Sequence, residues 1–176
     1  MSTAPHGRPD PLEFPPFYAA YVALVTEDDV VTALRNAGAE MTAALSKVTE
    51  ARGNYAYAEG KWSIKTVIGH VIDGERIFQT RALRVARADT TPLPGFDENA
   101  FAAISESNTR TMADLTGEWT ALRDCSVRMY DTFPRAAWRR IGTVNKGHIS
   151  VRALAFVTCG HARHHLNMLR QRYDVR

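Results

Sequence analysis

Apolar residues recur at helical spacing in four separate segments, and this periodicity limits the fold of the chain more than any other feature. The segments lie at residues 26–48, 63–86, 111–133 and from 150 onward. Spacing of three to four residues places apolar side chains on one face of a helix. Four such helices must bury their apolar faces against one another, so the sequence predicts an all-α fold with a four-helix bundle.

Capping residues predict where these helices begin and end. Thr26, followed by three acidic residues, is suited to cap the first helix, and Ser63 and Ser150 are suited to cap the second and the last. Pro134 ends the third helix. Two prolines and a glycine predict that ADTTPLPGFDENAFA, residues 88–102, is a long loop. Residues 140–150, RIGTVNKGHIS, read as another loop with a short extended piece.

The 176 residues suit one domain, preceded by a short arm. Residues 1–25 are rich in proline and predict an extended arm, whereas residues 26–176 form the predicted bundle. The arm contains no apolar core of signal-peptide length. The longest near-apolar run, Ala19 to Val25, is far too short to cross a membrane, so we expect no membrane contact.

Charge and cysteine content narrow the possible partners and the compartment. The net charge is +3, and the basic residues are spread along the chain. The tightest groups, Arg139-Arg140 and Arg170-Gln171-Arg172, have no aromatic platform beside them, so we expect no nucleic-acid partner. Cys125 and Cys159 form no CxxC pair, which favours a reducing, cytoplasmic setting over a disulfide framework.

Three of the six histidines lie in GHARHH, residues 160–165. On a helical wheel His161 and His165 fall within about 40° of each other, while His164 lies on the margin. The inward stripe contains Leu154, Val157, Thr158, His161, His165 and Met168. Two imidazoles at positions i and i+4 can share one metal ion. Ala162 stands where a zinc protease would carry its glutamate base, so the segment is not a zinc-protease motif. The competing interpretation is a basic, solvated tail.

A stable site needs a third ligand, and His6, His70 and His148 are candidates. His70 lies in the middle of the second predicted helix, one turn before Gly74, which leaves space beside a metal. A single histidine on an apolar face is more often a satisfied core residue than a ligand. Asp73 and Glu75 flank His70, and we expect both on a solvated face, although Asp73 could instead accept a hydrogen bond from an imidazole.

Several motifs together resemble those of the DinB/YfiT-like metalloenzymes. They are Trp62-Ser63 at the start of a helix, the segment GHVIDGE at residues 69–75, the loop LPGFDENAFA at residues 93–102, and His161-x-x-x-His165. A proline-rich and aromatic arm before the first helix is also similar, and the resemblance extends from about Pro15 to Tyr173.

The resemblance implies a bundle of four or five helices, often homodimeric, that binds one divalent ion per chain. It implies His70, His161 and His165 as the ligands, and His164 is not one of the three. Nickel and zinc are the ions that the resemblance implies, and three imidazoles suit both.

The resemblance also implies a function, while leaving alternatives open. Its leading implication is a thiol S-transferase that uses a low-molecular-weight thiol, such as bacillithiol or mycothiol, through a metal-bound thiolate. A metal-dependent hydrolase is the second possibility. A non-catalytic, metal-stabilised stress or binding protein is the alternative from another class. The sequence indicates no general base, so no catalytic residue is assigned beyond the ligands. A cleft beside the ion, with polar groups converging on it, would favour an enzyme.

Overall fold

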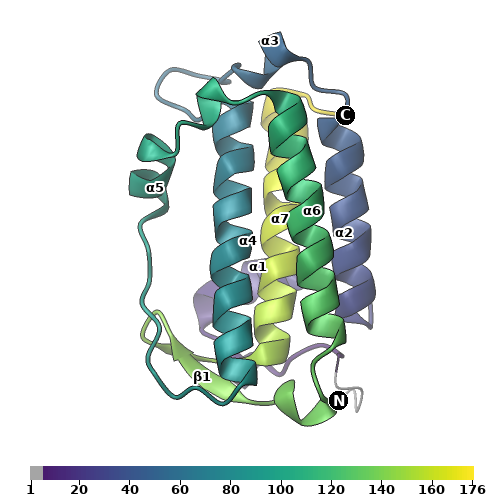
Figure 1. Ribbon diagram of the computed structural model, residues 1–176, viewed down its shortest axis with the longest axis vertical. Helices are drawn as coiled ribbons and strands as arrows, with labels where there is room; N and C mark the ends of the chain where they lie inside the picture. The colour runs from purple at the N-terminus through teal and green to yellow at the C-terminus, as the bar shows by residue number, and fades with distance from the viewer. Residues whose placement is uncertain (1–5) are drawn as a thin grey trace.

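Four long helices form the body of the protein in the computed structural model, which describes residues 6–176. They are α2 (Val30–Leu45), α4 (Ile64–Ala86), α6 (Met112–Asp131) and α7 (Val151–Tyr173), and they stand side by side along the long axis (Figure 1). The predicted all-α four-helix bundle is confirmed. Within the described residues, no helix is both long and apolar enough to cross a membrane.

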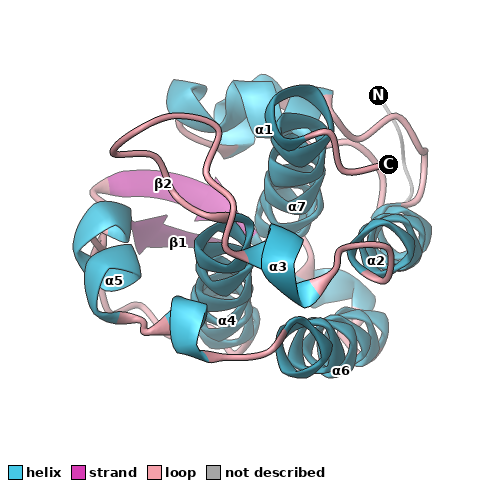
Figure 2. Cartoon of the chain, turned by 90° about the horizontal axis from the view of Figure 1, so that it is seen from above, coloured by secondary structure: helices cyan, strands magenta, loops and turns pink. Residues whose placement is uncertain are grey.

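The four helices pack in an order that differs from their order in the chain. Seen end on, α4 neighbours α7 and α6, and α2 neighbours the same two helices (Figure 2). Figure 1 shows α2 and α7 running one way along the bundle and α4 and α6 running the other way. Because α4 and α6 are parallel neighbours, the chain between them must return along the full length of the bundle.

Short polar side chains cap each long helix. Ser63, Thr111 and Ser150 cap α4, α6 and α7, each by accepting a hydrogen bond from the backbone N–H three residues later. The predicted cap at Thr26 was wrong, because α2 begins at Val30 and its cap is Asp29, which accepts from the Thr32 N–H at 2.7 Å. Glu27 instead turns towards α7 and pairs with Arg163 at 2.6 Å.

Helix α7 lies deeper in the molecule than its single predicted stripe implied. Every residue from Val151 to Ala162 is buried. Cys159 projects from the face of α7 opposite His161, because two residues at about 100° each separate them, yet its side chain is fully buried. Helices α2 and α4 cover part of α7, and a further helix from the N-terminal segment covers the rest. A helix covered on all sides is apolar around most of its surface.

That further helix is α1 (Ala19–Ala23), which follows the 3₁₀ turns η1 (Pro11–Glu13) and η2 (Pro16–Tyr18). The predicted extended arm was therefore wrong over these residues. Tyr18, Val22 and Val25 are buried in the core. Residues 1–5 of the predicted arm lie outside the described part of the chain. The N-terminal segment thus packs on the bundle as one of its layers.

Helix α1 approaches α7 closely at Gly160. A Cβ atom at this position would lie 2.0 Å from the backbone oxygen of Tyr21. Arg163, one turn further along α7, donates a hydrogen bond to the Leu24 carbonyl at 3.2 Å. The absence of a side chain at Gly160 therefore lets the two helices touch through their backbones.

The connections contain short elements that position the site. Residues after α2 form α3 (Glu50–Gly53), and residues before α7 form η4 (Arg135–Ala137) and a hairpin of β1 (Ile141–Val144) and β2 (Gly147–Ser150). The hairpin corresponds to the short extended piece that the sequence predicted within residues 140–150. The loop predicted at 88–102 holds for its first part only, because α5 (Glu98–Ile104) begins within it and is followed by η3 (Ser107–Thr109). Asp97 caps α5 by accepting from the Asn99 and Ala100 N–H groups.

Candidate metal centre

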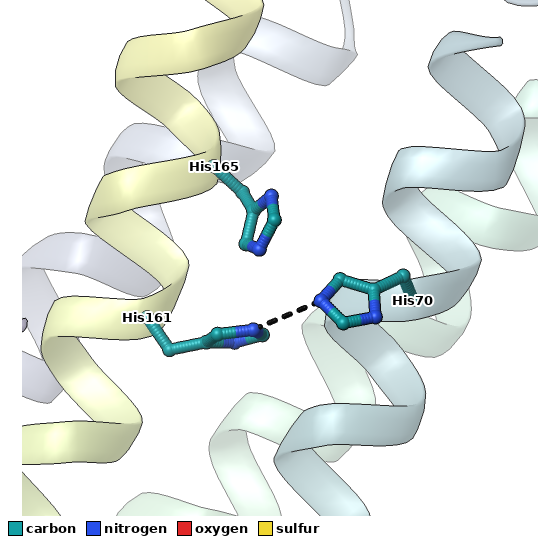
Figure 3. Close-up of side chains that lie close together, drawn as sticks. All are labelled: His70, His161 and His165. Carbon is teal, nitrogen blue, oxygen red and sulfur yellow. Dashed lines mark hydrogen bonds between the residues drawn. The ribbon is translucent and has the colours of Figure 1, made fainter. Parts of the chain in front are cut away.

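Three buried histidines meet between α4 and α7 (Figure 3). His70 comes from the second turn of α4, and His161 and His165 come from successive turns of α7. One ring nitrogen from each lies within 4.8 Å of the other two, and the Nε2 atoms of His70 and His161 are 3.1 Å apart. The structure therefore brings together the three residues that the resemblance had indicated as ligands.

Gly74 makes room for one of these rings. It lies one turn after His70 on α4, and a Cβ atom there would approach the His161 Cε1 atom to 2.8 Å. The sequence suggested that this glycine leaves space beside a metal. The structure shows that the space is filled by the His161 imidazole.

Burial favours the neutral form of all three imidazoles. It lowers the pKa of His70, although the negative charge of Glu98 partly opposes the effect. Burial and the neighbouring histidines lower the pKa values of His161 and His165 well below the usual range. A neutral imidazole has a free ring nitrogen, which is the form that binds a metal ion.

The residues around the three histidines also fit a metal ion. Within the described part of the chain, the buried Nδ1 atom of His165 has no hydrogen-bond partner. A metal–nitrogen bond is about 2.0–2.1 Å long, which requires ligand nitrogens roughly 3–3.5 Å apart in a tetrahedral site. The 3.1 Å between His70 and His161 is close to this value. The three histidines could thus hold one divalent ion and leave a further position open.

The other histidines are placed elsewhere. His6 lies 3.1 Å from Asp29 and packs against Trp138, and His148 is exposed on β2. His164 is exposed at the rim, next to the Tyr21 ring, as its marginal position on the wheel predicted. The two rival candidates for a third ligand are therefore not near the pair on α7.

The acidic residues beside His70 in sequence also point elsewhere. Asp73 is half-buried, and burial raises its pKa, with Arg76, Glu118 and Arg110 as its charged surroundings. No hydrogen bond joins Asp73 to a histidine among the described residues. The solvated position expected for Glu75 was wrong, since only 2% of its side chain is exposed and it pairs with Arg123 at 2.8 Å.

A cleft of about 470 Å³ opens beside the three histidines. Aromatic side chains form much of its wall: Phe17, Tyr18 and Tyr21 from the N-terminal segment, Trp62 and Phe78 from the α4 side, and Phe96 from the loop before α5. Polar groups line the rest, namely Arg81, Glu98, Asn99, Asn145 and His164. The size is typical of a small-molecule site, and polar groups from several elements line it together with the histidines.

The sequence indicated the histidines but not most of the cleft. Tyr21 comes from the segment predicted to be an extended arm, and its ring meets the His161 ring edge-on with centroids 5.6 Å apart. Glu98 comes from the segment predicted to be a loop. One local signal was available, because Asp97 followed by Glu98 is the cap and first-turn pattern of a helix.

Comparison with known proteins gives one family. Residues 33–169 match the model of the DinB superfamily. Over 103 residues the chain is 23% identical to the protein named "Putative metal-dependent hydrolase YfiT" of Bacillus subtilis (strain 168). That match covers 54% of this chain and 58% of the relative, so it spans less than two thirds of the relative's length.

Two solved structures share the fold. The structure of YfiT from Bacillus subtilis, described as a probable metal-dependent hydrolase with an unusual four-helix bundle topology, superposes with a TM-score of 0.73 at 18% identity, covering 84% of this chain and 87% of that one. The crystal structure of a mycothiol-dependent maleylpyruvate isomerase superposes with a TM-score of 0.66 at 15% identity, and the match covers 78% of this chain and 58% of that one. At these identities the likeness concerns the fold.

Proposed function

The chain belongs to the DinB superfamily, and on this premise we propose that it is a metal-dependent enzyme whose single divalent ion is held by His70, His161 and His165. The observation that carries the proposal is the meeting of three buried imidazoles at the wall of a cleft of about 470 Å³. A purely structural cluster of histidines would not need a cleft lined by polar groups beside it. The name of the relative YfiT, which refers to a metal-dependent hydrolase, supports the same class.

The reaction that we favour is transfer of a low-molecular-weight thiol to an electrophilic acceptor. A divalent ion with three neutral ligands keeps its full charge and lowers the pKa of a thiol or water at its open position. The cleft is large enough for a small thiol and an acceptor together. Its aromatic walls suit apolar parts of either molecule. The mycothiol-dependent isomerase with the same fold supports a thiol as a substrate.

Metal-dependent hydrolysis is the second candidate, and the likeness to YfiT favours it. The two reactions need the same site and differ in whether a thiol or a water attacks. We also propose nickel or zinc as the ion, a homodimer as the assembly and the cytoplasm as the location. Cys125 and Cys159 are free thiols, which is consistent with a reducing compartment.

Metal analysis of three purified variants tests the ligands. We expect one divalent ion per chain in the wild type and its loss in His70→Ala and His161→Ala. The matched control is His164→Ala, which removes an exposed imidazole of the same segment and should keep the ion. Full metal content in His70→Ala or His161→Ala would exclude the three-histidine assignment.

Activity assays with the metal-loaded protein then separate the three functional classes. Consumption of dithiothreitol or mycothiol with 1-chloro-2,4-dinitrobenzene as acceptor would support the transferase. Release of p-nitrophenol from p-nitrophenyl acetate without a thiol would support the hydrolase. A metal-loaded protein that accelerates neither reaction, yet unfolds at lower temperature without its ion, would support the non-catalytic alternative.

A further inference from the structure

Contacts with Arg81 and with the hairpin hold the segment before α5 in place, so that the first residues of α5 line the cleft. Leu93 and Asn145 join this segment to the hairpin through two backbone hydrogen bonds, Leu93 N–H to Thr143 O and Asn145 N–H to Leu93 O, each 2.9 Å long. Arg81, only 5% exposed, donates to the Pro94 carbonyl at 2.7 Å. Asp97 then caps α5, and Glu98 is its first residue.

Glycine at position 95 brings this segment against the hairpin turn. A Cβ atom at Gly95 would lie 2.4 Å from the Asn145 Oδ1 atom. Asn145 is the first residue of the turn between β1 and β2 and has a φ of 48°, a left-handed conformation that asparagine tolerates. Gly95 and Asn145 are both among the residues that line the cleft. The segment that carries Glu98 is therefore fixed by backbone and side-chain contacts from two other elements.

Glu98 lines the same cleft as the three histidines. Among the described residues it is the one carboxylate that lines this cavity. Burial lowers the pKa of His70 and the negative charge of Glu98 partly opposes this, while burial raises the pKa of Tyr21 and Glu98 adds to that effect, so the carboxylate lies close enough to influence both rings. The carboxylate is exposed, and no hydrogen bond or ion pair holds it within the described part of the chain, so it is available to a bound molecule.

We propose that Glu98 is the catalytic carboxylate that accepts the proton of the nucleophile in this cleft. This inference rests on the proposed function and adds the general base that the three ligands lack. As the thiol sulfur forms its bond to the acceptor carbon, the S–H bond breaks and the proton moves to the Glu98 carboxylate. The bond from carbon to the leaving group breaks, and Glu98 returns the proton to that group. For hydrolysis a water O–H takes the place of the thiol S–H. Neither reaction requires an oxidant or a reductant.

The other polar groups of the cleft are less suited to this role. Asn99 and Asn145 carry amides, which do not accept protons near neutral pH. Arg81 is cationic and already donates to Pro94. His164 is the sequence neighbour of the proposed ligand His165, and its ring packs edge-on against the His165 ring with centroids 5.1 Å apart. It therefore belongs to the histidine cluster itself, whereas Glu98 comes from a separate element that lines the cleft.

The test compares Glu98→Gln with a matched control in the same connection, Glu106→Gln. Glu106 is exposed, lies just after α5 and does not line the cleft. The first measurement is the affinity of the zinc-loaded protein for acetohydroxamic acid, which binds a divalent ion and gives up an O–H proton. We expect Glu98→Gln to weaken this binding at least tenfold and Glu106→Gln to leave it unchanged. Metal content should stay at one ion per chain in both variants.

The second measurement is turnover in the thiol and ester assays above. Loss of a positioned general base costs about 10²–10⁴-fold, so kcat of Glu98→Gln should fall at least a hundredfold, with part of it restored in Glu98→Asp. If the wild type shows no turnover, the proposed function fails, and the hydroxamate arm still decides the role of Glu98. Wild-type affinity in Glu98→Gln, no hydroxamate binding by the wild type, or a larger loss in His164→Asn than in Glu98→Gln would overturn the proposal.

Discussion

At the scale of single residues, Gly74 and His161 show how one missing side chain sets the shape of the candidate site. The Cβ of an alanine at position 74 would lie 2.8 Å from the His161 Cε1 atom, so the ring would have to turn away from His70. Ring position determines metal affinity, because each ligand nitrogen must lie about 2 Å from the ion. The effect should therefore be on metal binding more than on folding.

We predict that Gly74→Ala weakens zinc binding at least tenfold, measured by competition with a chromophoric chelator. The control is Gly117→Ala on α6, where a Cβ atom meets nothing within 4 Å. That variant should keep wild-type affinity and gain up to about 1 kcal/mol of stability from helix propensity. Equal zinc affinity in the two variants would show that His161 is not confined by Gly74.

The residues of the site differ in how well the sequence could predict them. His161 and His165 share a helix, so their common orientation follows from 3.6 residues per turn. His70 needed a resemblance, because nothing local relates α4 to α7. Glu98 was missed because its place depends on contacts to Arg81 and the hairpin, which lie far away in the sequence. The local sequence pattern thus indicated two of the three ligands and none of the other residues that line the cleft.

At the scale of secondary-structure elements, α1 depends on its close approach to α7. The backbone oxygen of Tyr21 occupies the position where a side chain at residue 160 would begin. A methyl group there has no flexible neighbour to displace, so α1 would have to move as a unit. Such a movement would also carry the Tyr21 ring away from His161.

We predict that Gly160→Ala lowers the free energy of unfolding by roughly 2–3 kcal/mol, the cost of overpacking a core contact. Urea denaturation would measure it, and hydrogen exchange should become faster for the amides of α1 than for those of α6. Gly117→Ala, which should raise the free energy of unfolding, again serves as the control. A Gly160→Ala protein as stable as the wild type would mean that α1 is not tightly docked.

The ion pair between Glu27 and Arg163 should make the attachment of the N-terminal segment depend on pH. Hydrogen bonds from Arg163 lower the pKa of Glu27 to about 2 from an ordinary value of 4.5. Because the folded pKa is the lower one, the pair contributes its full stability above about pH 5 and loses it as the pH falls towards 2. Solvent screening limits the contribution to about 1 kcal/mol.

We therefore expect Glu27→Gln to be about 1 kcal/mol less stable than the wild type at pH 6, with the difference vanishing near pH 2. Thermal unfolding across this range would measure it. Glu40→Gln is the control, since Glu40 lies 3.6 Å from Arg163 and is more exposed, so its effect should be smaller. A difference that stays constant from pH 6 to pH 2 would contradict the assignment.

At the scale of the whole molecule, a buried ion pair joins three of the four long helices. Glu75 on α4 forms a two-pronged contact with Arg123 on α6, at 2.9 and 2.8 Å, and Arg123 also donates to the Leu34 carbonyl on α2 at 3.1 Å. Ser126 donates a further hydrogen bond to Glu75. Because both charges are buried, removal of either one would leave the other in the core without its partner.

We predict that Glu75→Gln destabilises the fold by roughly 3–5 kcal/mol, because it leaves the Arg123 charge buried without its partner. The double variant Glu75→Leu/Arg123→Met removes both charges and should recover a large part of that loss. Chemical denaturation of the three proteins gives the comparison. A double variant less stable than Glu75→Gln would show that the pair stabilises the bundle beyond mutual neutralisation.

The bundle itself could be predicted, whereas its arrangement could not. Four amphipathic segments require that their apolar faces meet, so α2, α4, α6 and α7 follow from periodicity and caps. Which helices become neighbours depends on contacts such as Glu75 with Arg123, and Glu75 was expected on a solvated face. The depth of α7 likewise depends on α1, which covers it from a segment that showed no helical period.

The division of the three histidines between α4 and α7 also sets the order of events during synthesis. His70 leaves the ribosome early, but its partners belong to a helix that is made only after the long connection, α6 and the hairpin. At a translation rate of about 5–20 residues per second, the complete set becomes available roughly 5–20 s after His70 has been added. Until His161 has been added, the nascent chain therefore contains only one of the three proposed ligands, and the ion can be acquired with full affinity only once α7 has docked.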